Sequence, residues 1–195
     1  MLNNLLPTPL HPAIVHLPIA LMMLVPFFAF GALVAIARGG KVLRNWGITA
    51  ALLAALSLSA FVSLETGEDQ EDKVEAVVPE QAFETHEEAA QAFFVMSLAV
   101  LGIAGVGLLN GRAGTAARYV AAAGTLALVV AGYNVGHSGG KLVYQYGAAS
   151  AYIAGVGATA GGAAGGTAAV GAGGLDGAAA ADAVTGGDDD DDDDR

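Results

Sequence analysis

Residues 13–37 read AIVHLPIALMMLVPFFAFGALVAIA and contain no charged side chain. A helix needs about 20 predominantly apolar residues to cross the hydrocarbon core of a bilayer, so this run is long enough. Three further runs are similar, at residues 46–64, 89–109 and 116–135, and among them only Arg118 is charged. Its long stem can reach back to the membrane interface from the beginning of its run. No run shows the polar face of a soluble amphipathic helix. The sequence therefore predicts an all-α, integral membrane four-helix bundle.

The connections between these runs differ sharply in charge. Residues 38–45 and 110–118 carry five of the eight basic residues and no acidic residue. Of the 19 acidic residues, ten lie in residues 65–88 and the rest follow in the C-terminal tail. Loops rich in Lys and Arg stay on the cytoplasmic side. We therefore expect a multi-pass protein of the cell membrane, with both termini and the 65–88 connection outside.

The C-terminal part has a different composition from the rest. It is rich in Ala and Gly and ends in seven consecutive aspartates at 188–194. We expect a transmembrane domain at 1–147, followed at 148–195 by a disordered linker and acidic tail; a fifth membrane helix at 148–174 stays open as an alternative. Such acidity is typical of halophilic proteins and says little about partners, although its sign disfavours nucleic acid.

All four histidines lie beside helix ends that are expected to face outward: His11, His16, His86 and His137. Neutral imidazoles from different helices can ligate haem iron or another transition metal. The step of five positions from His11 to His16 corresponds to a net rotation of about 140° on a helix, so the two rings need not share a face. We expect His16, His86 and His137 to carry the site, with His11 either a further ligand or a helix cap.

Local patterns predict where two of these histidines lie on their helices. Thr85 and Glu88 have the spacing of a capping box, which predicts a helix that begins at His86 after a long soluble connection. The glycines at 136, 139 and 140 predict that the fourth helix ends around His137 and leaves room there for a flat ligand. The sequence contains no cysteine, which excludes covalently attached haem c and cysteine-ligated iron–sulfur clusters in this chain.

Four separated motifs carry a family resemblance: HP at 11–12 with HLP at 16–18, LETG at 64–67, THE at 85–87, and GHSGGKLVY at 136–144. In this order, over residues 8–147, they resemble domain-of-unknown-function family 2231. The resemblance implies a four-helix membrane fold with outward histidines, and an association of some relatives with cytochrome-like or Rieske-like modules. It implies no particular reaction.

The leading hypothesis is a membrane protein that binds b-type haem for electron transfer. Four-helix bundles hold haem between facing histidines, and His16 with His86 or with His137 would form the axial pair. We then expect His16→Ala and His137→Ala to abolish cofactor retention, and His11→Ala to matter less. A pair of haems that transfers electrons across the whole membrane is excluded, because no histidine lies at the inner face.

Two alternatives remain open at this point. A non-haem metal site could combine histidines with Glu65, Glu68, Asp69 or Glu87, which suits zinc, copper or iron. A cofactor-free helical subunit of a larger respiratory or redox membrane complex, or of an oligomer, would use the small residues of the third and fourth runs for close helix packing. We assign no catalytic residue, and whether the protein is an enzyme is open.

Overall fold

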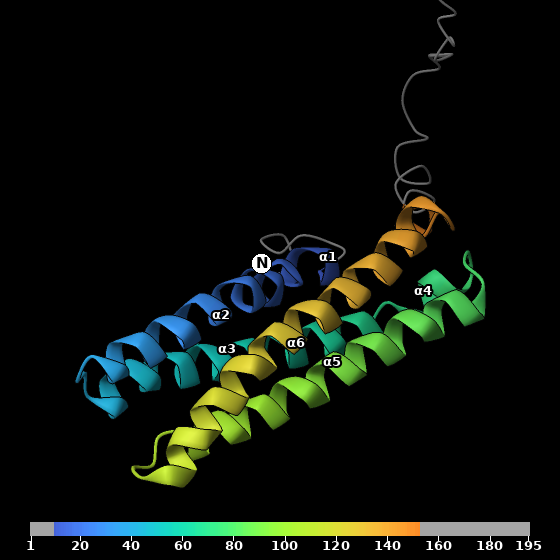
Figure 1. Ribbon diagram of the computed structural model, residues 1–195. Coiled ribbons are helices and arrows are strands. Elements are labelled where there is room, and N and C mark those ends of the chain that lie inside the picture. The colour runs from blue at the N-terminus through green and yellow to red at the C-terminus, as the bar shows by residue number, and fades with distance from the viewer. Residues whose placement is uncertain (1–9, 153–195) are drawn as a thin grey trace, which may run out of the picture. The chain divides into compact units, whose positions relative to one another are not determined.

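The protein is an antiparallel helical bundle, seen in a computed structural model that describes residues 10–152 (Figure 1). Its helices are α1 (His11–Ile14), α2 (His16–Ala37), α3 (Val42–Glu68), α4 (Glu71–Glu75), α5 (Glu80–Val106) and α6 (Arg112–Tyr144). Four segments are long and apolar enough to cross a membrane, namely α1 with α2, then α3, α5 and α6. The described residues form no strand. The predicted all-α bundle of four membrane helices is confirmed.

The first span is divided at Val15. Pro18 has no N–H to donate to the carbonyl of Ile14, so this turn lacks one helical hydrogen bond. The N–H of Val15 instead closes α1 on the carbonyl of His11 at 3.1 Å, and Ile19 donates to the carbonyl of Val15 at 3.2 Å. His11 is half-buried whereas His16, at the beginning of α2, is exposed, as the rotation of about 140° between them allows.

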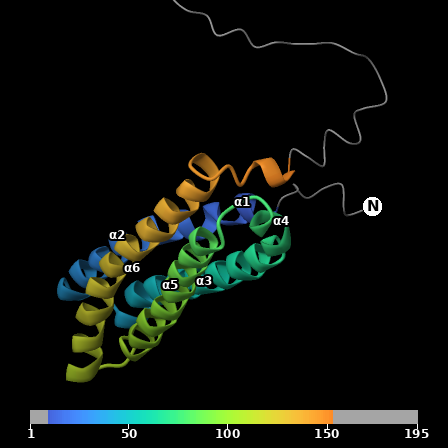
Figure 2. The same cartoon turned by 90° about the vertical axis from the view of Figure 1, so that its right-hand side faces the viewer.

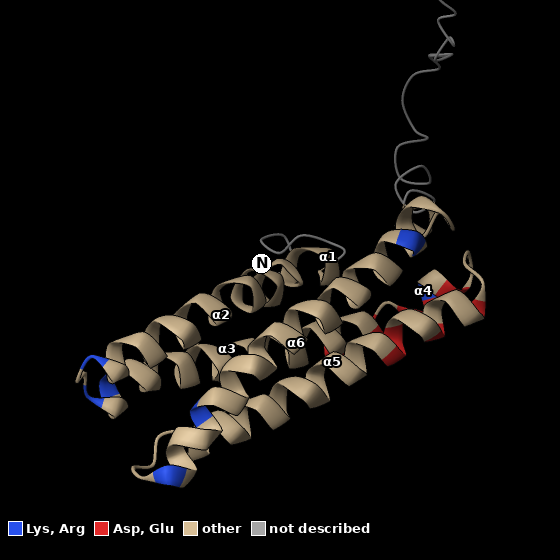
Figure 3. Cartoon of the chain, in the orientation of Figure 1, with Lys and Arg blue, Asp and Glu red and all other residues tan. Residues whose placement is uncertain are grey.

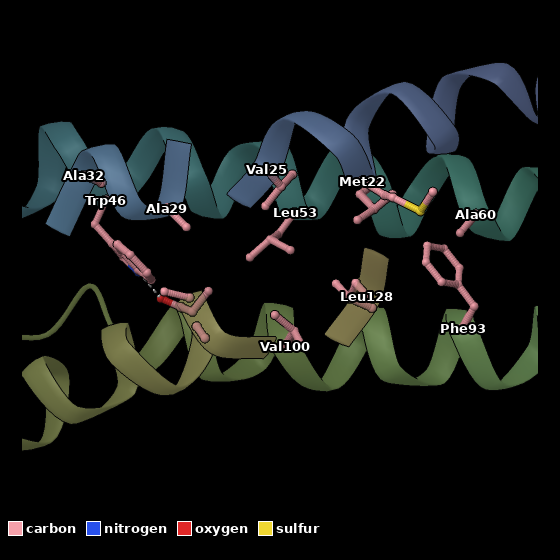
Figure 4. Packing of buried hydrophobic residues seen from close by; sticks show 14 residues of the cluster. Met22, Val25, Ala29, Ala32, Trp46, Leu53, Ala60, Phe93, Val100 and Leu128 are labelled. Atoms are coloured by element: carbon pink, nitrogen blue, oxygen red, sulfur yellow. Dashed lines mark hydrogen bonds between the residues drawn. The ribbon is translucent and has the colours of Figure 1, made fainter. Parts of the chain in front are cut away.

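The bundle consists of two antiparallel pairs, α2 with α3 and α5 with α6, which also touch through α3–α5 and α2–α6 (Figures 1 and 2). Its core is built mainly from aliphatic side chains, with Trp46 at one end of the cluster (Figure 4). The indole N–H of Trp46 donates to the carbonyl of Ala104 at 2.9 Å. Large apolar side chains also cover the outside, as with Phe27, which is 75% exposed. Such a surface suits lipid rather than water.

Charged side chains gather at the two ends of the bundle (Figure 3). Basic residues of the α2–α3 and α5–α6 connections lie at one end. The acidic residues at the end of α3, on α4 and at the beginning of α5 lie at the other, together with Lys73 and Lys141. The helices therefore alternate in direction as the charge pattern predicts. We call these the basic end and the acidic end.

The side chain of Arg118 reaches from α6 to the end of α5. It is 5% exposed, and its guanidinium donates to the carbonyls of Gly107 at 2.6 Å and Leu109 at 3.2 Å, and to Thr115 Oγ1 at 2.9 Å. Those carbonyls follow the last turn of α5, where a helix leaves acceptors without partners. A cation at the C-terminal end of a helix is also favoured by the helix dipole. Arg118 thus caps the C-terminal end of α5.

Two predicted helix boundaries are wrong. Helix α5 begins at Glu80 after Pro79, and Thr85 lies inside it, where its hydroxyl donates to the carbonyl of Gln81 at 2.7 Å instead of capping. Helix α6 continues past the glycines at 136, 139 and 140 to Tyr144. Membrane helices tolerate glycine because neighbouring helices keep the backbone in place. His86 and His137 therefore both lie within helices.

The acidic end carries a small second core. Val74 and Val78 pack against Leu142 and Ala148, so that the segment around α4 covers the extension of α6. Tyr152 packs against the same cluster, and burial raises the pKa of its phenol. The predicted linker and tail, and the alternative fifth helix, lie outside the described residues from position 153 onward.

Candidate functional site: a histidine pair between the helices

His11 is held against α3 by its ring nitrogen. Its Nδ1 lies 2.9 Å from the carbonyl oxygen of Ser63. A carbonyl can only accept, so Nδ1 carries the hydrogen and donates it, which leaves the Nε2 lone pair available. A Cβ at Gly67 would lie 3.3 Å from Cε1 of this ring. The glycine thus lets the backbone of α3 approach the imidazole closely.

His86 is held in the same manner against α6. Its Nδ1 lies 3.0 Å from Ser138 Oγ, and that hydroxyl donates its single hydrogen to the carbonyl of Val135 at 3.0 Å. Ser138 therefore accepts from Nδ1–H, and His86 takes the same tautomer as His11. A Cβ at Gly139 would lie 2.9 Å from Cε1, so here too a glycine backbone lies against the ring.

The two rings lie next to each other between the helices. Their centroids are 6.5 Å apart and their planes are inclined by 85°. Two metal–nitrogen bonds of about 2.0–2.1 Å, together with the half-widths of the two rings, span nearly this distance. Within residues 10–152 neither Nε2 forms a hydrogen bond. The pair thus places two imidazole rings, each with its Nδ1 engaged, at a centroid separation close to that of two ligands of one metal centre.

The other two histidines lie on the outside of the bundle. His16 is exposed on α2, and His137 is exposed on α6, where its ring stacks on Tyr133 with a centroid distance of 5.9 Å. His137 and Ser138 are adjacent in the chain, so they lie about 100° apart around α6. Ser138 consequently faces His86 while His137 faces outward. The structure therefore brings His11 and His86 together and leaves His16 and His137 apart from them.

Carboxylates do not complete a larger ligand set. Within the described residues no group of three or more His, Cys, Asp or Glu side chains is arranged to hold a metal ion. Glu87, the neighbour of His86, accepts a hydrogen bond from Gln91 Nε2 at 2.8 Å. The carboxylates considered for a non-haem site, at 65, 68, 69 and 87, thus do not join the histidine pair.

Sequence reasoning assigned none of the groups that support the two rings to His11 or His86, although it expected the glycine at 139 to leave room for a ligand. The supporting groups are the carbonyl of Ser63, the hydroxyl of Ser138, and the glycines at 67 and 139. Three of these four positions fall inside the motifs LETG and GHSGG. The motifs LETG and GHSGG were therefore the available signal. Which histidine each motif supports depends on the packing of the helices.

A protein-family model described as "Predicted membrane protein (DUF2231)" matches residues 7–152. No curated protein and no solved structure matches this chain. The matched range includes all four membrane-spanning segments and both members of the histidine pair.

Proposed function

Because the chain belongs to the DUF2231 family of predicted membrane proteins, we propose a function that operates within a bilayer: binding of b-type haem by Nε2 of His11 and His86, for electron transfer. The observation that carries this proposal is the geometry of the pair. Two imidazoles from different spans lie 6.5 Å apart, and each uses Nδ1 for a hydrogen bond to a neighbouring helix.

The composition of the ligand set favours haem over a bare metal ion. A porphyrin supplies four nitrogens, so the protein has to provide only axial ligands, and two histidines suffice. Zinc and non-haem iron need three or four protein ligands, commonly with a carboxylate. Residues 10–152 offer no such group. The donor set therefore fits haem better than the non-haem alternative.

The protein's own groups would orient and tune the ligands. The Ser63 carbonyl and the Ser138 hydroxyl fix each ring and raise the basicity of its Nε2, as outer partners of metal-bound histidines do. The glycines at 67 and 139 keep the backbones of α3 and α6 against the two rings. When bound, haem would supply one-electron redox chemistry.

We further propose that the basic end faces the cytoplasm and that the acidic end, with the histidine pair, faces outward from the cell membrane. The positive charge of the α2–α3 and α5–α6 connections supports this orientation. A single site near one side exchanges electrons on that side, so its partner would be a redox component or complex that reaches the outer face of the membrane.

Alanine variants of the four histidines test this proposal, with haem content of the detergent-purified protein as the readout. His11→Ala and His86→Ala should lose haem. His16→Ala and His137→Ala are matched controls, because each comes from the same half of the bundle as one ligand and is exposed. The reverse pattern would assign ligation to the exposed pair. Unchanged haem content in all four variants would contradict ligation by these histidines, and purified wild-type protein without haem would favour a cofactor-free subunit.

A further inference from the structure

An apolar groove lies between α2 and α3 near the basic end of the bundle. Its volume is about 280 Å³, and Phe27, Phe28, Gly31 and Ala35 of α2 line it together with Asn45 and Ile48 of α3. A Cβ at Gly31 would meet no atom within 4 Å, so the missing side chain at this position helps to keep the groove open. From Phe27 to Ala35 the groove extends for about 12 Å along α2. This shape suits a hydrocarbon chain.

Three exposed cations follow the groove at its basic end. Arg38 lies one helical turn beyond Ala35, and Arg44 lies one turn before Ile48, so both share a helix face with a lining residue. Lys41 lies four positions before Asn45, another lining residue, and Asn45 Nδ2 donates to the Lys41 carbonyl at 2.9 Å. Every acidic residue of the described part of the chain lies at the other end (Figure 3). The three cations therefore have no carboxylate near them.

We propose that this groove and its basic rim form a binding site for one anionic phospholipid. An acyl chain occupies the groove, and the phosphate is bound by Arg38, Lys41 and Arg44. Charge complementarity selects this occupant, because guanidinium groups pair well with phosphate oxygens and a basic rim beside the membrane attracts anionic lipid. The site is remote from the histidine pair and does not depend on haem.

The test compares lipid binding to the full-length, detergent-purified chain by native mass spectrometry. The probes are phosphatidylglycerol and phosphatidylcholine with identical acyl chains. Phosphatidylglycerol should bind more tightly. Its affinity should fall about fivefold for each rim charge removed, hence roughly 25-fold in the double variant Arg38→Gln/Arg44→Gln. Arg112→Gln is the matched control, since it removes an exposed cation from the other connection at the same end.

A second variant tests the groove separately from the charges. Gly31→Leu fills it without meeting any atom at the position of Cβ, so the helix should fold normally and phosphatidylglycerol binding should weaken. Equal binding of the two lipids would overturn the proposal, as would an equal loss in Arg112→Gln. Unchanged phosphatidylglycerol binding in Gly31→Leu would overturn the acyl-chain site. Equally tight binding of inorganic phosphate alone would overturn the assignment to lipid.

Discussion

The imidazole rings of His11 and His86 lie 6.5 Å apart and nearly perpendicular, at 85°, although they belong to the first and third membrane spans. The remaining two spans provide the oxygens that hold them, the Ser63 carbonyl of α3 and the Ser138 hydroxyl of α6. All four spans thus meet at this one pair. The geometry of the pair depends on how the whole bundle is packed, which is why it is the most informative place to perturb.

Gly139→Ala should displace the His86 ring. The new Cβ would lie 2.9 Å from Cε1 and 3.4 Å from Nδ1, closer than side chains normally approach. Because a side-chain ring can move more easily than backbone, we expect the bundle to fold but haem content to fall. Gly140→Ala is the control, since its Cβ would meet nothing within 4 Å. Haem content and far-UV circular dichroism report the outcome, and equal haem in both variants would argue against a positioned His86.

Arg118→Met should lower the free energy of unfolding by about 1–3 kcal/mol, because the buried carbonyl of Gly107 and the part-buried carbonyl of Leu109 lose their donor. Arg118→Lys should recover part of this loss, since an ammonium cannot reproduce the planar fork. Denaturation in SDS, followed by circular dichroism, measures the effect. The exposed Arg112→Gln should change stability by less than about 0.5 kcal/mol. A comparable loss in that control would contradict the capping role.

Thr49→Val should raise the free energy of unfolding by about 1 kcal/mol. Thr49 Oγ1 is the only buried side-chain polar atom of residues 10–152 without a hydrogen-bond partner, and valine removes that cost with nearly the same shape. Thr125→Val is the matched variant. Its hydroxyl donates to the carbonyl of Ala122 at 2.6 Å, so the same change should bring no gain. Similar shifts in the two SDS titrations would show that the hydroxyl of Thr49 is not the cause.

The absence of cysteine allows the orientation to be tested with single cysteines. Asp72→Cys lies on exposed α4 at the acidic end, and Ala113→Cys lies exposed at the beginning of α6 at the basic end. In intact cells a membrane-impermeant maleimide should label the first variant, and the second only after permeabilisation. The opposite labelling pattern would place the histidine pair on the cytoplasmic side.

The number of membrane helices and their alternation followed from the sequence, because the length of an uncharged run and the charge of its flanks directly reflect the bilayer. Helix ends at the acidic end did not. The glycines of α6 and Thr85 were interpreted by rules for soluble helices. In the bundle, α6 continues through its glycines, and Thr85 donates a hydrogen bond to a carbonyl of its own helix.

The composition of the candidate site was only partly predictable for a similar reason. All four histidines were identified as candidates. Which of them point toward a neighbouring helix depends on the packing and cannot be read from residue spacing alone. The spacing of His11 and His16 places them on different faces of the first span, but only the packing decides that His11 is the one turned toward the other helices. A rotation of one residue on α6 makes Ser138, and not His137, the partner of His86. Both effects arise from tertiary packing.

The central claim is tested most directly by a reduced-minus-oxidised visible spectrum of the purified protein, made with an ample haem supply and quantified as the pyridine haemochrome. We predict a sharp b-type reduced band, at one haem per chain, that disappears in the double variant His11→Ala/His86→Ala. Folded protein without haem absorbance, or a double variant that keeps its full haem content, would contradict the account.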